Sequence, residues 1–151
     1  MKNISVLNRK DKKRFLELLK KQFDFKEKMD YSFLTNNKNK IFIINKDIAN
    51  IELNNIRINS MGLYIAEMSN NEVRLSIEGS QIIGPKSGKN IIELTKEQAR
   101  EWIKGKDIEI SSEKNKFVIL KHDDDYLGTG KATKEKILNF IPKARRLNVS
   151  D

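Results

Sequence analysis

The segment YLGTGKATKEKILNFIPKARRL, residues 126–147, decides the fold of this chain, and the other elements are arranged around it. It opens on a Gly-x-Gly pair with a lysine directly after it. An apolar run follows, and the segment ends in a proline with three cations close behind. We expect extended backbone through this segment, with a turn near Lys134 and Glu135. A short helix over residues 133–139 is the alternative.

The tetrapeptide GTGK at residues 128–131 invites comparison with the phosphate-binding loop of nucleotide hydrolases. That loop has the pattern G-x-x-x-x-G-K-[ST], in which the last residue binds Mg²⁺ through its hydroxyl. Here Asp125 stands where the first glycine belongs, and Ala132 replaces the hydroxyl residue. Nucleotide hydrolysis is therefore not predicted. The glycines instead allow a neighbouring strand or a sugar-phosphate to approach the backbone closely.

Basic residues gather near this glycine-rich segment and at the end of the helix that precedes it. Lysine and arginine side chains contact phosphates, and arginine also pairs with a guanine edge or stacks on a base. The spacing predicts an RNA contact surface, and scattered solvated cations are the alternative. The cations concerned are Lys104, Lys106, Lys131, Lys143, Arg145 and Arg146.

No catalytic motif is recognised in the chain. His122, the single histidine, precedes three consecutive aspartates, whose carboxylates at a turn point in different directions and stay solvated. A calcium ion at this turn is the alternative, although the EF-hand spacing is absent. Neither the G-x-S-x-G motif of serine hydrolases nor the glycine-rich loop of a doubly wound methyltransferase is present. We predict no catalytic residue, no metal site and no cofactor.

The first half of the chain predicts one helix followed by strands, which is an α+β arrangement. Apolar residues recur at three- and four-residue spacing over residues 8–25, and Asn8 is placed to cap this helix. Residues 28–39 are polar and Asn-rich and predict a loop, with Tyr31, Phe33 and Leu34 touching the core. Alternating or β-branched patterns predict strands at residues 40–45, 55–59, 62–68 and 73–77, with a turn at Asn70 and Asn71.

Positive charge dominates the composition. The chain has 30 Lys or Arg against 21 Asp or Glu, a net charge of +9, which favours anionic partners such as nucleic acid. A lysine-rich source proteome is the alternative explanation. On the first helix, a solvated face is the simplest interpretation of the lysines opposite the apolar side, and a nucleic-acid contact is the alternative. These lysines are Lys12, Lys13, Lys20 and Lys21.

The sequence has no cysteine and no apolar N-terminal segment. Disulfides, thiolate metal sites and a cysteine nucleophile are excluded. We expect neither a secretory signal nor a membrane span, and a cytoplasmic location.

The second half predicts a boundary, a short helix and several strands. Residues 79–89 hold three of the seven glycines and one of the two prolines, and predict a boundary that docks on the core through Ile82 and Ile83. Thr95 and Gln98 fit a capping box at the start of a helix that Gly105 ends. Strands are predicted at residues 90–94, 108–110 and 117–121, with a hairpin tip at residues 123–125.

The second half also resembles a PUA domain. The resemblance rests on WIKGKDI at residues 102–108 and on FVILKHDDDYLGTGKA at residues 117–132. The tail LGTGK…ILNFIPKARRL closely resembles the PUA-like tail of archaeal and eukaryotic Sun-family RNA cytosine C5-methyltransferases. The catalytic domain of those enzymes, with its paired cysteines, has no counterpart in this sequence.

The resemblance implies a small N-terminal α/β unit, residues 1–80, followed by a PUA-like mixed β pseudo-barrel, residues 81–151. RNA in such domains lies between the helix and a neighbouring strand, which implies contacts at Lys104, Gly105, Lys106, Gly128, Gly130 and Lys131. The expected function is non-catalytic recognition of structured tRNA or rRNA in RNA modification or ribosome biogenesis, without DNA or membrane partners. A protein-interaction module that assists a separate RNA-modifying enzyme is the alternative.

Overall fold

The computed structural model describes residues 4–47, 62–69, 71–112 and 115–147, and within them the chain forms two sheets. The first sheet is antiparallel. In spatial order it contains β1 (Ser5–Val6), β2 (Ser32–Thr35), β3 (Lys40–Ile44), β4 (Leu63–Met68) and β5 (Val73–Leu75). The predicted strand at residues 55–59, with Ile56 and Ile58, and Asn70 of the predicted turn lie outside the described residues.

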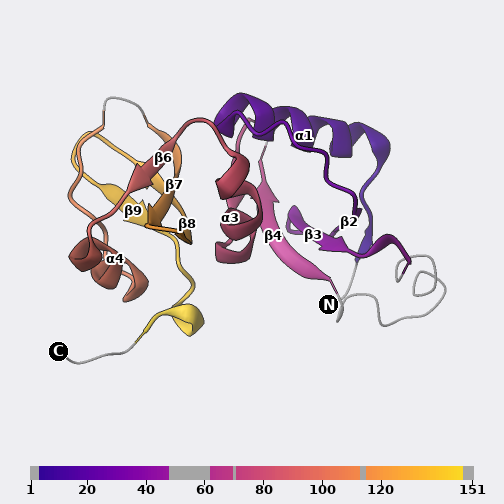
Figure 1. Ribbon diagram of the computed structural model, residues 1–151. Coiled ribbons are helices and arrows are strands. Elements are labelled where there is room, and N and C mark those ends of the chain that lie inside the picture. The colour runs from indigo at the N-terminus through magenta and orange to yellow at the C-terminus, as the bar shows by residue number, and fades with distance from the viewer. Residues whose placement is uncertain (1–3, 48–61, 70, 113–114, 148–151) are drawn as a thin grey trace.

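The second sheet is mixed. Its strands, in spatial order, are β6 (Ile91–Glu93), β7 (Lys116–His122), β8 (Asp125–Ala132) and β9 (Ile137–Asn139). Strands β6 and β7 run parallel, whereas the other neighbours are antiparallel. The helices that lie entirely within the described residues are α1 (Arg9–Phe23), α3 (Ile77–Ile83) and α4 (Lys96–Ile103), with short 3₁₀ turns η2 (Gly84–Lys86) and η3 (Lys143–Arg145). The predicted α+β class is confirmed, and Figure 1 shows α3 between the two sheets.

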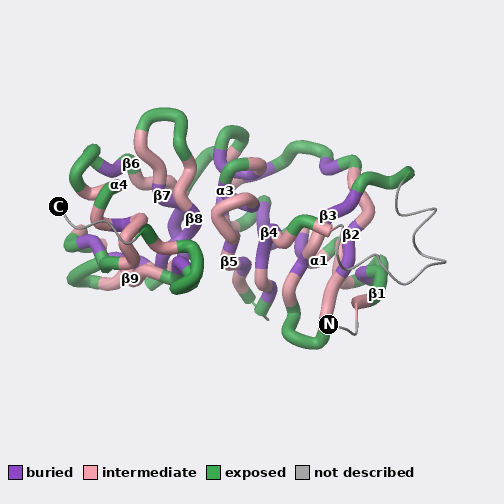
Figure 2. The backbone as a smooth tube through the Cα atoms, turned by 90° about the horizontal axis from the view of Figure 1, so that it is seen from below, coloured by how far each residue is buried: buried purple, intermediate pink, exposed green. Residues whose placement is uncertain are grey.

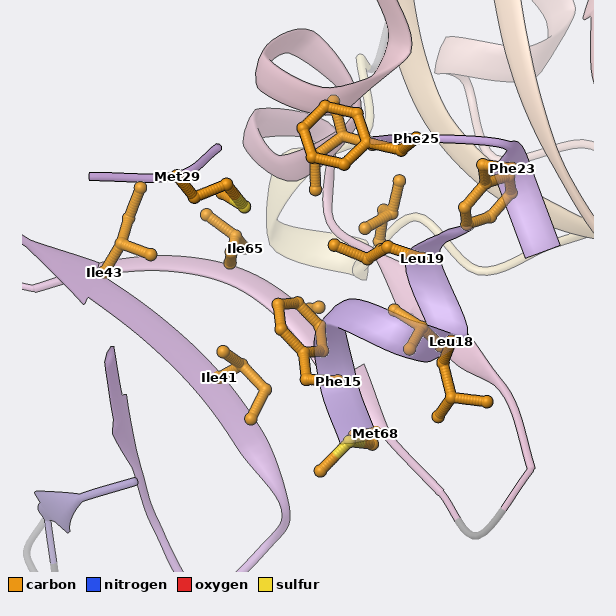
Figure 3. Close-up of a cluster of buried hydrophobic side chains, with 14 of the residues drawn as sticks. Phe15, Leu18, Leu19, Phe23, Phe25, Met29, Ile41, Ile43, Ile65 and Met68 are labelled. Carbon is orange, nitrogen blue, oxygen red and sulfur yellow. The ribbon is translucent and has the colours of Figure 1, made fainter. Parts of the chain in front are cut away.

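Helix α1 covers one face of the first sheet. Asn8 caps its start, because the side-chain oxygen accepts a hydrogen bond from the Asp11 amide at 2.8 Å. Its apolar residues follow the predicted spacing, and Phe15 and Leu19 are fully buried. Figure 3 shows these two side chains facing Ile41 of β3 and Ile65 of β4. The predicted helix and its cap are confirmed.

Two predictions for the first half are wrong. Residues 28–39 are not all loop, because β2 pairs with β3 there, although Phe33 and Leu34 are buried in the core as predicted. The polar residues around this short apolar pair hid the strand. The predicted strand at 73–77 ends at Leu75, because the Ser76 hydroxyl accepts from the Gly79 amide at 3.0 Å and starts α3.

Helix α3 and the 3₁₀ turn η2 that follows it occupy most of the segment that the sequence predicts as a boundary. Gly79 allows α3 to lie directly on β4, because a Cβ there would stand 2.0 Å from the Ile65 carbonyl oxygen. Ile83 is fully buried, as expected for a segment that docks on the core. The position between residues 80 and 81 falls inside this helix. The division into two domains at that position stays a prediction.

The second half confirms most of the predicted pattern. Both bonds of the capping box are present, 3.0 Å from the Gln98 amide to the Thr95 hydroxyl and 2.9 Å from the Thr95 amide to the Gln98 side chain. The predicted turn before β9 is present, so the alternative helix over residues 133–139 is wrong. The predicted strand at 108–110 is reduced to a single bridge between Ile108 and Ile137.

Trp102 is the centre of the second core. Its ring is fully buried, and its indole N–H donates to the Leu127 carbonyl at 2.9 Å. The ring lies against β8 at Gly130, where a Cβ would stand 2.6 Å from both Trp102 and Ile137. Figure 2 shows the buried positions along β4, β7 and β8 and the exposed connections around them. Among the described helices, none has the length and apolar character needed to cross a bilayer.

Replacing Gly130 by Ala should destabilise the fold. The new methyl group would meet the Leu138 carbonyl oxygen at 2.7 Å in addition to the two side chains. We expect the free energy of unfolding to fall by about 2 kcal/mol, as for other overpacked cores. Urea denaturation followed by Trp102 fluorescence measures this. Gly62→Ala is the control, because its methyl group would meet no atom closer than 3.3 Å. Equal stability of the two variants contradicts the packing argument.

Candidate nucleic-acid interface

Strand β8 forms a seam with the N-terminal half. The Gly128 amide donates to the Ser80 hydroxyl at 2.8 Å, and the Thr129 hydroxyl donates to the Leu75 carbonyl at 3.0 Å. These contacts are buried, because Gly128, Ser80 and Thr129 are all buried residues. Gly128 has a φ of 91°, a conformation that favours glycine. The group that lies close to the Gly128 backbone is therefore a protein side chain, the Ser80 hydroxyl.

Two predicted RNA-contact cations form ion pairs across the same seam. The Lys131 ammonium lies 3.2 Å from both carboxylate oxygens of Glu72 and 4.5 Å from the centre of the Phe117 ring. Arg145 donates two hydrogen bonds to Glu78, at 3.1 and 2.8 Å. The Arg145 guanidinium lowers the pKa of the Glu78 carboxyl. Both cations thus have partners in the N-terminal half.

The remaining predicted residues surround the C-terminal end of α4. Gly105 has a φ of 98°, as predicted for the residue that ends a helix. The Arg146 side chain covers it, since a Cβ on Gly105 would stand 2.4 Å from Arg146 Cδ. Lys104 and Lys106 both approach Glu101, at 3.6 and 2.8 Å. Lys106 is the main cause of the lowered pKa of the Glu101 carboxyl.

Two cations of the tail differ in their surroundings. The Arg146 Nε–H donates to the Ile141 carbonyl at 2.9 Å, which fixes the side chain over Gly105. Lys143 is exposed on η3, and no carboxylate of the described chain lies within ion-pair distance of it. The Leu147 amide donates to the Ile103 carbonyl at 2.9 Å and holds the tail against α4.

A groove of about 520 Å³ lies between α4 and the β7–β8 hairpin, and we call it the α4 groove. One wall is a face of α4, the other is the hairpin, and the tail contributes Leu147. The PUA resemblance predicts RNA between the helix and a neighbouring strand, but of the six residues that it implies, only Lys104 lines this groove. The lining residues are Lys96, Ala99, Arg100, Ile103, Lys104, His122, Asp125, Leu127 and Leu147.

The α4 groove combines a cationic edge with an apolar floor. Lys96, Arg100 and Lys104 recur every four residues, so they follow one face of α4. Leu127 and the 49% exposed Leu147 supply apolar surface beside them. Cations suit phosphates, and apolar surface suits an unstacked base. Sequence reasoning named Lys104 but missed Lys96 and Arg100, although the four-residue spacing was visible.

His122 belongs to the same groove, and its imidazole is already engaged. Its Nδ1 lies 2.9 Å from the Leu94 carbonyl oxygen, which favours the tautomer that carries the proton there. Among the described residues, Glu93, His122 and Asp123 bring three possible ligand atoms within 4.8 Å of one another. Glu93 accepts from the Asp123 amide at 2.8 Å and lies 3.6 Å from the Lys121 ammonium. These contacts explain the cluster without a metal ion.

Comparison with known proteins places this groove inside a recognised domain. Residues 89–147 match the family described as the methyltransferase RsmF PUA domain. The chain is similar to "Ribosomal RNA small subunit methyltransferase F" of Vibrio cholerae serotype O1 (strain M66-2), with 28% identity over 92 residues, 60% of this chain and 20% of that protein. Residues 89–147 are therefore similar to a PUA domain, and the predicted resemblance to the tail of RNA methyltransferases is confirmed.

Two further relatives with the same description agree. The protein of Vibrio campbellii (strain ATCC BAA-1116) is 32% identical over 95 residues, covering 58% of this chain and 20% of the relative. The protein of Vibrio parahaemolyticus serotype O3:K6 (strain RIMD 2210633) is 33% identical over 94 residues, with the same coverages of 58% and 20%. These relatives are bacterial, whereas the sequence resemblance pointed to archaeal and eukaryotic members. The chain spans about a fifth of the length of each.

Replacing Arg145 by Gln (R145Q) tests its role in the seam. The pKa of Glu78 in the folded protein lies below its ordinary value of about 4.3, so the pair stabilises the fold above that pH. The contribution is lost as the pH falls through the folded-state pKa. Both side chains are partly exposed, so we expect R145Q to lose only about 0.5 kcal/mol at pH 7.

Urea denaturation at pH 7 and at about pH 3 measures this difference, which should narrow at the lower pH because protonation of Glu78 removes the charge that Arg145 pairs with. Lys143→Gln is the control, since Lys143 has no ion-pair partner among the described residues. A stability loss in R145Q that persists unchanged at the acidic pH contradicts the assignment.

Proposed function

We propose that this chain binds structured RNA, with rRNA as the first candidate, through the α4 groove of its PUA-like domain. One observation carries the proposal: the cationic, apolar-floored groove lies within the residues that match the RsmF PUA domain. The relatives are described as acting on ribosomal RNA of the small subunit, which favours rRNA over tRNA. A cytoplasmic location is part of this proposal.

The chemistry of the groove supports recognition of phosphates and shape more than of base sequence. Lys96 and Arg100 are exposed along one edge and suit two neighbouring phosphates. The surface of Leu127 and Leu147 suits the face of a single unpaired base. Asp125 at the hairpin end of the groove repels phosphate, so we orient the RNA backbone along α4.

The nine residues predicted for RNA contact take two different roles in this proposal. Those at the end of α4 and on the tail are placed to touch RNA beside the groove. They are Lys104, Lys106, Lys143 and Arg146, with Gly105 beneath the Arg146 side chain. The others act indirectly, by fixing β8 against the N-terminal half and against Trp102. They are Gly128, Gly130, Lys131 and Arg145.

We further propose that this chain itself contributes binding and no chemistry. The matching part of the methyltransferases is their PUA domain. The sequence contains no cysteine, the residue type that the methyltransferase resemblance assigns to catalysis. His122 is bonded to a backbone carbonyl, which accounts for its position without a reaction.

The test is RNA binding by the double variant K96Q/R100Q. Fluorescence anisotropy with a labelled hairpin of small-subunit rRNA gives the dissociation constant at several salt concentrations. We expect about tenfold weaker binding at about 0.15 M salt, and a log–log salt slope shallower by about 1.5, because two phosphate contacts release fewer counterions. The control K86Q/K134Q removes the same charge at exposed positions outside the groove and should stay within about twofold of the wild type.

Two results contradict the proposal. One is a wild-type protein whose RNA binding is weak and insensitive to salt. The other is an equal loss of affinity in K96Q/R100Q and K86Q/K134Q, which makes the groove no more than a part of a general positive surface. Binding of an acidic protein by a wild type that ignores RNA favours the role of an interaction module.

A further inference from the structure

We infer that the N-terminal half carries a second surface for RNA phosphates, along α1, and that one structured RNA contacts both halves. This inference rests on the proposed function. The surface is a groove of about 610 Å³ between α1 and the segment that returns from it, and we call it the α1 groove. Its lining residues are Arg9, Lys12, Lys13, Leu16, Glu17, Lys20, Phe25, Lys26, Glu27, Lys28, Met29 and Lys46.

The spacing of the lining residues on α1 defines a second face of that helix. Positions 9, 12, 13, 16, 17 and 20 follow steps of three and four residues, so they lie in one row along the helix. The core face of α1 is a different row, made by Phe15, Leu18, Leu19 and Phe23. The row along the groove therefore has little role in packing, apart from the half-buried Leu16 and from Lys12, whose ammonium lies 5.1 Å from the centre of the Phe33 ring.

Residues 9–28 carry more positive charge than the ion pairs of the fold neutralise. Residues 9–28 contain nine Lys or Arg and four Asp or Glu, a net of +5 within a chain of +9. Lys26 and Lys46 pair with exposed aspartates, at 3.4 and 2.8 Å. By contrast, no carboxylate of the described chain lies within ion-pair distance of Arg9, Lys13 or Lys20. Their mutual repulsion is relieved when an anion binds in the row.

The chemistry of the α1 groove favours a polyanion over a protein or a bilayer. A protein hot spot or a membrane-inserting face needs large exposed apolar side chains. The exposed large apolar residues of the described chain, Val6, Leu63, Phe140 and Leu147, all lie outside this groove. Its own apolar residues Phe25 and Met29 are buried in the floor. What the groove presents is a majority of cations, with Arg9, Lys13 and Lys20 exposed at helical spacing on α1 and the carboxylates of Glu17 and Glu27 among them.

The position of the α1 groove would allow a structured RNA to bind both halves of the molecule at once. Figures 1 and 2 show α4 and α1 in different halves of the molecule, with α3 and β8 between them. The seam of buried hydrogen bonds at β8 holds the halves together. A folded RNA that reaches both grooves gains from their linkage, whereas a short oligonucleotide in the α4 groove does not.

The double variant K13Q/K20Q tests this inference in the full chain. The probes are a labelled small-subunit rRNA hairpin of about 40 nucleotides and a five-uridine oligonucleotide, each measured over a range of salt. We expect about tenfold weaker binding of the hairpin at about 0.15 M salt and a salt slope shallower by about 1.5. Affinity for the oligonucleotide should be unchanged.

The matched control is K10Q/K21Q, which removes two exposed lysines of the same helix that do not line the groove. It should bind the hairpin within about twofold of the wild type. Thermal unfolding of all variants checks the fold. If K13Q/K20Q unfolds at a lower temperature than K10Q/K21Q, a third variant, K28Q, replaces it, because Lys28 lies in the segment outside the helix. We expect K28Q to bind the hairpin about threefold more weakly than the wild type.

Each result decides between the two proposals. Normal hairpin binding by K13Q/K20Q, or an equal loss in K10Q/K21Q, overturns the α1 groove and leaves the proposed function intact. A wild type that does not bind the hairpin overturns both. Polyglutamate serves as a probe for an acidic protein. If K13Q/K20Q binds polyglutamate more weakly than the wild type but binds the hairpin equally well, the inference is overturned, because the surface then belongs to an acidic protein.

Discussion

Strand β8 is the element on which both halves of the molecule depend, because protein contacts its backbone closely on two sides. At Gly128 the amide donates to Ser80 of α3, and at Gly130 the ring of Trp102 occupies the place of a side chain. A larger residue at Gly130 collides with the core of the second sheet. The short Gly-x-Gly segment therefore joins the first sheet, through α3, to the second sheet and α4.

This constraint changes how the cations of the second half are interpreted. Lys131 lies one residue from Gly130, and its ammonium reaches Glu72 at 3.2 Å because β8 runs along the N-terminal half. Arg145 reaches Glu78 on α3 for the same reason. A cation next to a glycine-rich turn can thus pair with a carboxylate of the N-terminal half as readily as with a phosphate of bound RNA. Among the described residues, Lys96 and Arg100 at the edge of the α4 groove have no such carboxylate partner and remain available to an anion.

Local patterns in the sequence predicted the elements whose cause is local. The Asn8 cap, the Thr95–Gln98 capping box and the left-handed Gly105 each depend on residues within a few positions. Strand β2 and helix α3 were not predicted, because each depends on a distant partner. Strand β2 pairs with β3 around a buried Phe33, and α3 depends on the close approach of Gly79 to Ile65.

The same distinction applies to the candidate sites. Residues Lys131 and Glu72 are 59 positions apart, and nothing in the pattern around either residue reveals the other. In contrast, the row Lys96, Arg100 and Lys104 is visible from helical spacing alone, once the start of α4 is fixed by its capping box. A cation is informative about function when the fold leaves it without a carboxylate. On that criterion Lys96 and Arg100 on α4, and Arg9, Lys13 and Lys20 on α1, are stronger candidates for phosphate contact than the cations beside the glycines. Each set needs only one helix to align it, whereas a pair across the seam needs the whole fold.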